Sequence, residues 1–362
     1  MGKMGTDRYN LDGHKLYWHL DRVLQWQKGD LIPPVYLEIS PVSYCNHNCV
    51  FCGKDFARDE RHRLDTALTC RRLEEMGRLG VRSIMFAGEG EPLMHEDLAR
   101  MVATAKGAGI DVSITTNGSL GSRQRWAELL PHLTWLRFSL DAGSAETYAS
   151  VHGVAPKVFG QTLASLEAAL ELRDRMGLET TIGVQYLVLP ENWRDIENAL
   201  ERFTRLGVDY LALKPFSLNP KMLRHGDVAY QEEMIQHLDQ VTGRYQGRSR
   251  TNVIFRREAM NAYMNRSQNY RHCHALPFWG YICASGDLYT CAVFIGDERF
   301  KAGNINRQDM AEVFFGQARR DSVCLGQRDL SVGEECRLNC RMARANEFLE
   351  HLSLPPQHVN FI

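Results

Sequence analysis

Short apolar runs alternate with amphipathic stretches along much of the chain. The apolar runs have the length and the β-branched and aromatic content of buried strands. They are Tyr36–Ile39, Ser83–Ala87, Asp111–Thr115, Trp135–Ser139, Thr181–Val188 and Tyr210–Lys214. The stretches between them repeat apolar residues at helical spacing, over Thr66–Leu79, Glu96–Ala108, Arg123–Leu130, Val158–Met176 and Trp193–Leu206. This alternation predicts an α/β fold of parallel βαβ units. Six repeats are too few for a closed eight-fold barrel, so we predict an open, partial (β/α)6 barrel.

The remaining segments predict smaller units on either side of the barrel. One helical pattern, around Lys15–Lys28, precedes Pro33-Pro34. Residues 218–270 are polar, and we expect one or two helices there that bridge two domains. The expected units are an N-terminal helical extension, the barrel, a small cysteine-rich domain of β-hairpin and helix, and a tail, at residues 1–34, 35–250, 251–350 and 351–362.

Composition and net charge argue against several classes of function. The 362 residues carry a net charge of -1 and are 44% hydrophobic, so the chain can bury a core and has no overall charge that favours nucleic acid. We find no apolar run long enough to span a bilayer and no apolar signal core at the start. We therefore expect a cytoplasmic protein without nucleic-acid or membrane partners. Its ten cysteines indicate metal or redox chemistry rather than disulfides.

Three of these cysteines follow the first predicted strand. Cys45, Cys49 and Cys52 form a C-x3-C-x2-C pattern, which predicts a metal site at the end of the sheet. Soft thiolates suit zinc or an iron–sulfur cluster. On a four-iron cube, three cysteines leave one iron free to bind another molecule. The alternative is a zinc site whose fourth ligand is His47 or a distant residue.

This pattern resembles the signature of the radical S-adenosylmethionine (radical SAM) superfamily, C-x3-C-x-Φ-C with an aromatic residue at Φ. Phe51 fills that position. The resemblance implies a [4Fe–4S] cluster on Cys45, Cys49 and Cys52, and S-adenosylmethionine on its open iron. Reduction would then give a 5′-deoxyadenosyl radical that abstracts hydrogen from the substrate. An external one-electron donor such as flavodoxin or ferredoxin is the expected redox partner.

The second strand is followed by glycines and carboxylates that resemble the family's GGEP motif. Gly88, Gly90 and Glu91 match its backbone-binding pattern, which holds the methionyl amino group. The match is displaced by one residue from the commonest form, so the roles of Glu89 and Glu91 stay open. Glycine at these positions allows backbone to approach a ligand closely.

Later strand ends offer further polar candidates. The resemblance implies that Asn117 and Ser139 contact the cosubstrate and that Asp141 orients substrate, although Asn117-Gly118 also fits an ordinary turn. Lys214 could meet a carboxylate, phosphate or hydroxyl of the substrate, or extend to solvent.

A second group of cysteines lies near the C-terminus. Its members are Cys273, Cys283, Cys291, Cys324, Cys336 and Cys340. A hairpin is predicted around residues 284–287, and Cys336 and Cys340 are expected on one face of a starting helix. The region resembles the SPASM/twitch extensions, which carry auxiliary [4Fe–4S] clusters. The expected ligands are Cys273, Cys291, Cys336 and Cys340, with Cys283 or Cys324 as substitutes for one of them and zinc as the alternative metal.

The cysteine layout resembles twitch-type dehydrogenases. The predicted substrate is a small carbohydrate-like molecule, namely a sugar, aminosugar or nucleotide-linked sugar, and oxidation is favoured over epimerisation. An epimerase would need a thiol near the substrate to return hydrogen, and Cys283 and Cys324 are the candidates. The alternatives are a SPASM-type maturase that forms a thioether, carbon–carbon crosslink or formylglycine in a peptide or protein, and a non-enzymatic zinc adaptor.

Overall fold

All strands described in the computed structural model belong to one sheet. The model describes residues 8–11, 13–59, 61–224, 226–266 and 268–361. The sheet has ten strands in the order β10-β9-β8-β1-β2-β3-β4-β5-β6-β7. The strands are β1 Tyr36–Ile39, β2 Ser83–Phe86, β3 Asp111–Thr116, β4 Trp135–Ser139, β5 Thr181–Val188, β6 Tyr210–Pro215, β7 Asn252–Phe255, β8 Trp279–Ile282, β9 Asp287–Tyr289 and β10 Lys301–Asn304.

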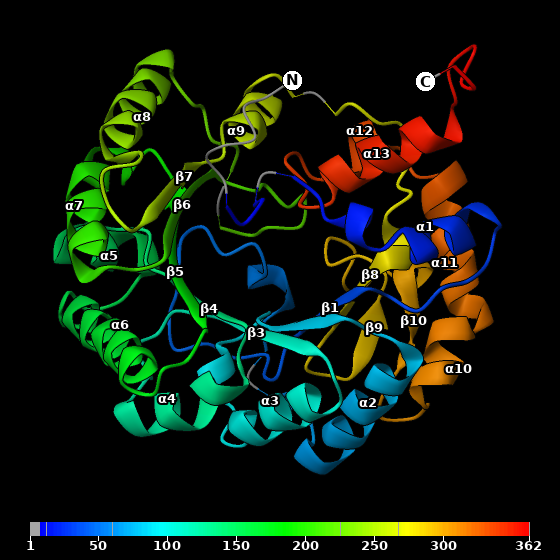
Figure 1. Cartoon of the computed structure of the whole chain (residues 1–362), viewed down its shortest axis with the longest axis horizontal. Helices are drawn as coiled ribbons and strands as arrows, with labels where there is room; N and C mark the ends of the chain where they lie inside the picture. The colour runs from blue at the N-terminus through cyan, green and yellow to red at the C-terminus, as the bar shows by residue number, and fades with distance from the viewer. Residues whose placement is uncertain (1–7, 12, 60, 225, 267, 362) are drawn as a thin grey trace.

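Helices cover the outer face of the curved sheet, and the chain returns through them between parallel strands (Figure 1). The helices among the described residues are α1 Leu20–Gln27, α2 Thr66–Leu79, α3 Leu98–Gly107, α4 Arg123–Leu129, α5 Ala145–His152, α6 Lys157–Arg175, α7 Ile196–Leu206, α8 Glu232–Tyr245, α9 Arg257–Met264, α10 Met310–Phe315, α11 Gln317–Arg328, α12 Val332–Glu335 and α13 Ala343–Ser353. Local sequence fixes their ends. Asp65 caps α2 by accepting from Leu68 N, and Gly80 ends it with a φ of 90°.

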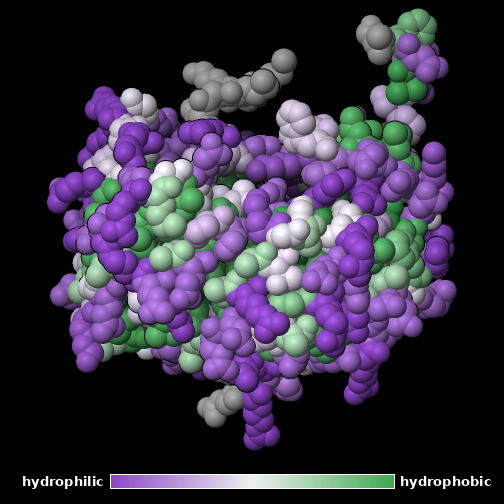
Figure 2. All heavy atoms as spheres, turned by 60° about the horizontal axis from the view of Figure 1, so that its bottom comes forward, coloured by the Kyte–Doolittle hydropathy of each residue, from purple (hydrophilic) through white to green (hydrophobic). Residues whose placement is uncertain are grey.

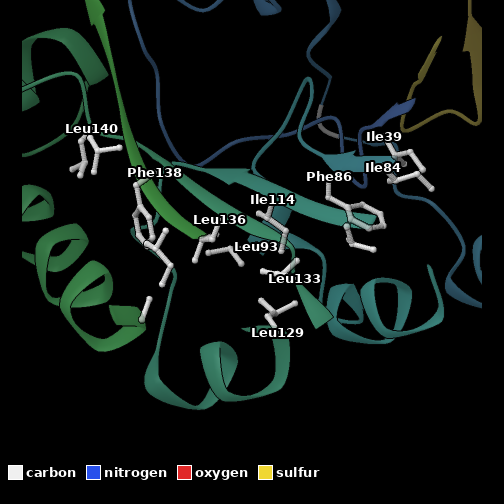
Figure 3. Packing of buried hydrophobic residues seen from close by; sticks show 14 of the residues in the cluster. Ile39, Ile84, Phe86, Leu93, Ile114, Leu129, Leu133, Leu136, Phe138 and Leu140 are labelled. Carbon is white, nitrogen blue, oxygen red and sulfur yellow. The ribbon is translucent and has the colours of Figure 1, made fainter. Parts of the chain in front are cut away.

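The core lies between the sheet and these helices. Strand residues such as Ile114 and Leu136 point toward the helices and lie near Leu129 and Leu133, and Ile84 lies beside Ile39 and Phe86 (Figure 3). The outer surface is largely hydrophilic, with small apolar areas between charged side chains (Figure 2). Side chains alternate between the two faces of a strand, so the residues between these apolar positions face the inside of the barrel.

The six predicted strands are confirmed to within one residue at each end, and the open barrel is confirmed as the fold. The expected bridge at residues 218–270 does contain two helices, α8 and α9, but it also contains β7. This strand pairs in parallel with β6 and extends the barrel sheet beyond residue 250. The charged residues on both sides of this short strand hid its apolar pattern in the sequence.

The C-terminal hairpin is confirmed, but it is continuous with the barrel. β8 and β9 pair antiparallel, as predicted, and β8 also pairs in parallel with β1. The predicted helix at Cys336–Cys340 is wrong, because α12 ends at Glu335 and α13 begins at Ala343. Asn339, with a φ of 58°, adopts a left-handed conformation that an α-helix does not contain.

At the N-terminus, the predicted helical segment consists of the 3₁₀ turn Leu16–Trp18 and α1. The first seven residues, on which the expectation of no signal core rested, lie outside the described residues. Within the described part of the chain, no helix combines the length and the hydrophobicity needed to cross a membrane.

Candidate active site between two groups of cysteines

The loop after β1 carries Cys45, Cys49 and Cys52, and α5 holds it in place. Asn48 N and Val50 N donate hydrogen bonds of 3.0 Å to the carbonyl oxygens of His152 and Val151 at the end of α5. His152 also places its Nδ1 3.2 Å from Cys49 Sγ. These contacts with α5 hold the loop in place, although residues 45–52 form no helix or strand themselves.

The three thiols of this loop are electrostatic neighbours. Burial raises the pKa of Cys45 to about 11 and the pKa of Cys49 well above its ordinary value, and the other thiols add to the shift in Cys49. A bound cation reverses this effect, because a coordinated thiol is deprotonated. The donor set therefore fits a [4Fe–4S] cluster with three protein ligands. His47, Cys49 and His152 also bring ligand atoms within 4.8 Å of one another, so the loop offers donors for the zinc alternative too.

Gly88 and Gly90 let the end of β2 lie directly against this loop. A Cβ on Gly88, whose φ is 139°, would lie 2.3 Å from the Ser40 side chain, and one on Gly90 would lie 2.1 Å from Tyr44 O. Gly90 N donates to Val42 O at 3.1 Å. The two glycines thus position the backbone that leads into Cys45.

The sequence did not distinguish the roles of Glu89 and Glu91. In the structure these two carboxylates accept hydrogen bonds from different parts of the chain. Glu91 is buried and accepts hydrogen bonds from Leu93 N at 3.1 Å and Asn117 N at 2.8 Å. Glu89 is also buried and accepts from Ala284 N at 3.2 Å, in the hairpin turn. Burial raises the pKa of both carboxyl groups. Glu91 therefore orders the end of β3, and Glu89 joins the end of β2 to the hairpin.

Asn117 reaches the cysteine loop from the end of β3. Its Nδ2 donates to Asn46 Oδ1 at 2.9 Å and lies 3.9 Å from Cys45 Sγ. Ser139, at the end of β4, is partly buried. Asp141 is fully buried, and its Oδ1 accepts from Leu187 N at 2.6 Å. Burial raises the pKa of Asp141 to about 7. Asp141 thus joins the ends of β4 and β5.

Four of the six C-terminal cysteines come together near Tyr270. Cys273, Cys291, Cys336 and Cys340 are among one another's strongest electrostatic neighbours. Burial raises the pKa of Cys273 to about 12 and that of Cys291 to about 11. This is the predicted set, brought together by loops rather than by a helix face.

Hydrogen-bond donors point at these thiols. Met342 N donates to Cys340 Sγ at 3.4 Å, and Asn346 Nδ2 donates to Cys273 Sγ at 3.6 Å. N–H groups aimed at sulfur favour thiolates, and four thiolates can close a tetrahedral zinc site or ligate every iron of a cube. The residues fit an auxiliary cluster.

The other two C-terminal cysteines lie apart from this set. Cys283, at the end of β8, is 5% exposed and lies beside Glu89. Burial raises the pKa of the Cys283 thiol well above its ordinary value, and the Glu89 carboxylate raises it further. Cys324 lies on α11 and is partly buried. Neither is among the strongest electrostatic neighbours of the four clustered thiols.

A cavity of about 190 Å³ lies between the two groups of cysteines. The loop that contains Cys52 contributes Phe51, Gly53 and Lys54, and the segments that carry the second group contribute Ala292, Arg337 and Arg341. The remaining lining residues are Glu38, Gln185, Leu187, Lys214, Phe216, Ser217, Asn219 and Trp279. Of the predicted catalytic residues, Lys214 is in this wall, whereas Cys283 and Cys324 are absent from its described lining. A cavity of about 220 Å³ beside α9 and α13 borders Cys340, but its described lining contains no residue of the Cys45–Cys52 loop.

Several of these lining residues were missed from the sequence. Glu38 left a signal, since it is a carboxylate inside an otherwise apolar strand. Lys54 follows Cys52 by two residues, and Arg337 and Arg341 lie in the segment around Cys336 and Cys340. Their convergence depends on tertiary contacts that spacing alone does not show.

Comparison with known proteins identifies a family domain within the chain. Residues 39–203 match the model of the radical SAM superfamily. A GTP 3′,8-cyclase of Chlorobaculum tepidum is 38% identical over 118 residues, which cover 32% of this chain and 36% of the cyclase. A tungsten-containing aldehyde ferredoxin oxidoreductase cofactor-modifying protein of Pyrococcus furiosus is 28% identical over 200 residues, or 54% of each chain. The chain thus spans about a third of the length of the cyclase and about half of the length of the cofactor-modifying protein.

Solved structures share the fold. SuiB of Streptococcus suis, bound to precursor peptide SuiA, has a TM-score of 0.63 at 19% identity, over 84% of this chain and 71% of SuiB. Native anSMEcpe with bound AdoMet has a TM-score of 0.59 at 18% identity, over 87% of this chain and 88% of the other. At these identities the likeness concerns the arrangement of the backbone.

Proposed function

The chain carries a radical SAM domain, and from this premise we propose that it oxidises a small polar substrate held between its two groups of cysteines. The position of the cavity carries the proposal. Phe51, Gly53 and Lys54 form one wall and Ala292, Arg337 and Arg341 another. A substrate there lies between the loop expected to bind S-adenosylmethionine and a second redox centre.

In this proposal each cysteine group binds one [4Fe–4S] cluster. Cys45, Cys49 and Cys52 hold the cluster that binds S-adenosylmethionine, and Cys273, Cys291, Cys336 and Cys340 hold the auxiliary cluster. When bound, the first cluster and S-adenosylmethionine supply a hydrogen-abstracting 5′-deoxyadenosyl radical, and the second supplies an electron acceptor. An external donor such as flavodoxin or ferredoxin supplies the reducing electron.

The absence of a thiol from the described cavity lining supports oxidation over epimerisation. An epimerisation needs a hydrogen donor within about 3–3.5 Å of the reacting carbon. Cys283 is directed toward Glu89 and is nearly inaccessible, and Cys324 lies on α11. Without a donor, the substrate completes the reaction by losing one further electron and a proton.

The lining supports a sugar, an aminosugar or a nucleotide-linked sugar as substrate. Gln185, Ser217 and Asn219 offer uncharged donors and acceptors of the kind that bind hydroxyl groups. A relative that is similar to this chain over 118 residues is named GTP 3′,8-cyclase, and GTP contains a phosphorylated ribose.

The test is to incubate the reconstituted protein with reductant, S-adenosylmethionine and candidate sugars in deuterium oxide, and to weigh the product by mass spectrometry. A product that has lost two hydrogens and gained no deuterium supports oxidation. A product with one deuterium in place of hydrogen contradicts it, and loss of that label in Cys283→Ala or Cys324→Ala would identify the donor. Modification of peptides alone would favour the maturase alternative.

A further inference from the structure

We propose that the substrate carries a phosphate or diphosphate group, which the cationic side chains of this cavity bind. The inference rests on the proposed function and specifies its substrate class. Lys54, Lys214, Arg337 and Arg341 line the cavity, whereas Glu38 is the single carboxylate in its described lining.

The carboxylate is already paired. Glu38 Oε2 accepts from Arg341 Nη1 at 2.7 Å, and the same guanidinium group donates to Tyr36 Oη at 2.9 Å. Lys54 donates only to a neutral group, the carbonyl of Ala292 at 2.6 Å, among the described residues. Lys54, Lys214 and Arg337 therefore remain as basic side chains of the lining after this ion pair is counted.

Lys214 has neither a hydrogen bond nor an ion pair within the described parts of the chain. Burial lowers the pKa of Lys214 well below its ordinary value, and Arg137, Arg256 and Arg341 lower it further. The opposing carboxylate, Asp141, is fully buried and held by Leu187 N. These surroundings disfavour the charged form of Lys214, and an anionic ligand beside it would favour that form by compensating its charge.

The arrangement suits phosphate better than a single carboxylate. The cations come from β6, from the loop after Cys52 and from the segment between α12 and α13, and they surround the cavity from several directions. A phosphate monoester carries about −1.5 to −2 charges near neutral pH and presents three acceptor oxygens. Guanidinium groups bind such oxygens through two parallel hydrogen bonds, and an ammonium group binds as a point charge.

The experiment measures binding of uridine diphosphate, inorganic pyrophosphate, citrate and uridine to the reconstituted protein by isothermal titration calorimetry. We expect uridine diphosphate and pyrophosphate to bind, and uridine to bind at least tenfold more weakly than uridine diphosphate. Lys214→Met should weaken diphosphate binding at least tenfold. Lys106→Met, which removes an equal charge from the exposed surface of α3, should leave it unchanged.

Equal affinity for uridine diphosphate and uridine would overturn the proposal, as would equal binding by the two lysine variants. Tighter binding of citrate than of pyrophosphate would assign the cations to a carboxylate and overturn it too. Lys214→Arg, which retains the charge, should retain binding and serves if Lys214→Met does not fold. Cleavage of S-adenosylmethionine by Lys214→Met, measured in parallel without substrate, tests the radical chemistry separately from the anion site.

Discussion

Lys54 Nζ donates a hydrogen bond of 2.6 Å to the backbone carbonyl of Ala292. Lys54 follows Cys52 by two residues, and Ala292 follows Cys291 directly. The ammonium group also lies 4.2 Å from the centroid of the Tyr281 ring. This side chain therefore links the two cysteine groups along the wall of the cavity.

Lys54→Met should uncouple the two sites. Because the hydrogen bond to Ala292 is lost, we expect the yield of product per 5′-deoxyadenosine to fall several-fold, while cleavage of S-adenosylmethionine continues. Chromatographic quantification of both products measures the ratio. Lys221→Met is the matched control, since Lys221 Nζ donates to the nearby carbonyl of Ile295 at 2.9 Å but is not in the described lining of the cavity. An unchanged ratio in Lys54→Met would refute this role.

Gly90→Ala should damage the first cysteine site. The added methyl group would lie 2.1 Å from Tyr44 O, so the backbone before Cys45 must move. We expect the variant to retain about half of the wild-type iron and to lose cleavage of S-adenosylmethionine. Gly160→Ala is the control, because it adds a methyl group with no neighbour within 4 Å on α6 and should stabilise the helix by up to about 1 kcal/mol. Normal iron content in Gly90→Ala would show that the loop tolerates the shift.

Asp141→Asn should change how stability depends on pH. Burial raises the pKa of Asp141 from 3.8 to about 7, so between these values the folded state binds more protons than the unfolded state. The free energy of unfolding therefore decreases as pH rises through this window, by up to about 1.4 kcal/mol per pH unit. The variant has no ionisable group at this position, so its free energy of unfolding lacks this decrease. The difference in stability between variant and wild type should therefore shift in favour of the variant from pH 4 to pH 7. Thermal unfolding of both proteins at several pH values measures this.

The sequence predicts those elements whose structure depends on contacts between residues close together in the chain. The barrel strands were predictable because strands of a parallel sheet are buried on both faces and form continuous apolar runs. β7 was missed because its few residues, Asn252–Phe255, lie in a charged segment. Spacing grouped Cys336 with Cys340 correctly, but a loop through Asn339, rather than a helix, brings them together.

The cavity depends on contacts that local patterns do not encode. Arg341 donates a hydrogen bond to Glu38, which lies 303 residues away in the sequence. β8 pairs with β1, although β2 to β7 lie between them in the sequence. Charged residues within otherwise apolar strands, such as Glu38 and Lys214, are the signal that sequence reading can use. Their partners become apparent only when the strands are placed side by side.

Iron content tests the central claim that each group of cysteines holds its own cluster. Anaerobically reconstituted wild-type protein should contain about eight irons and eight sulfides per chain. Triple substitution of Cys45, Cys49 and Cys52 by alanine should leave about four, and substitution of Cys273, Cys291, Cys336 and Cys340 should leave the other four. About four irons in the wild type, or stoichiometric zinc at either site, would contradict the account.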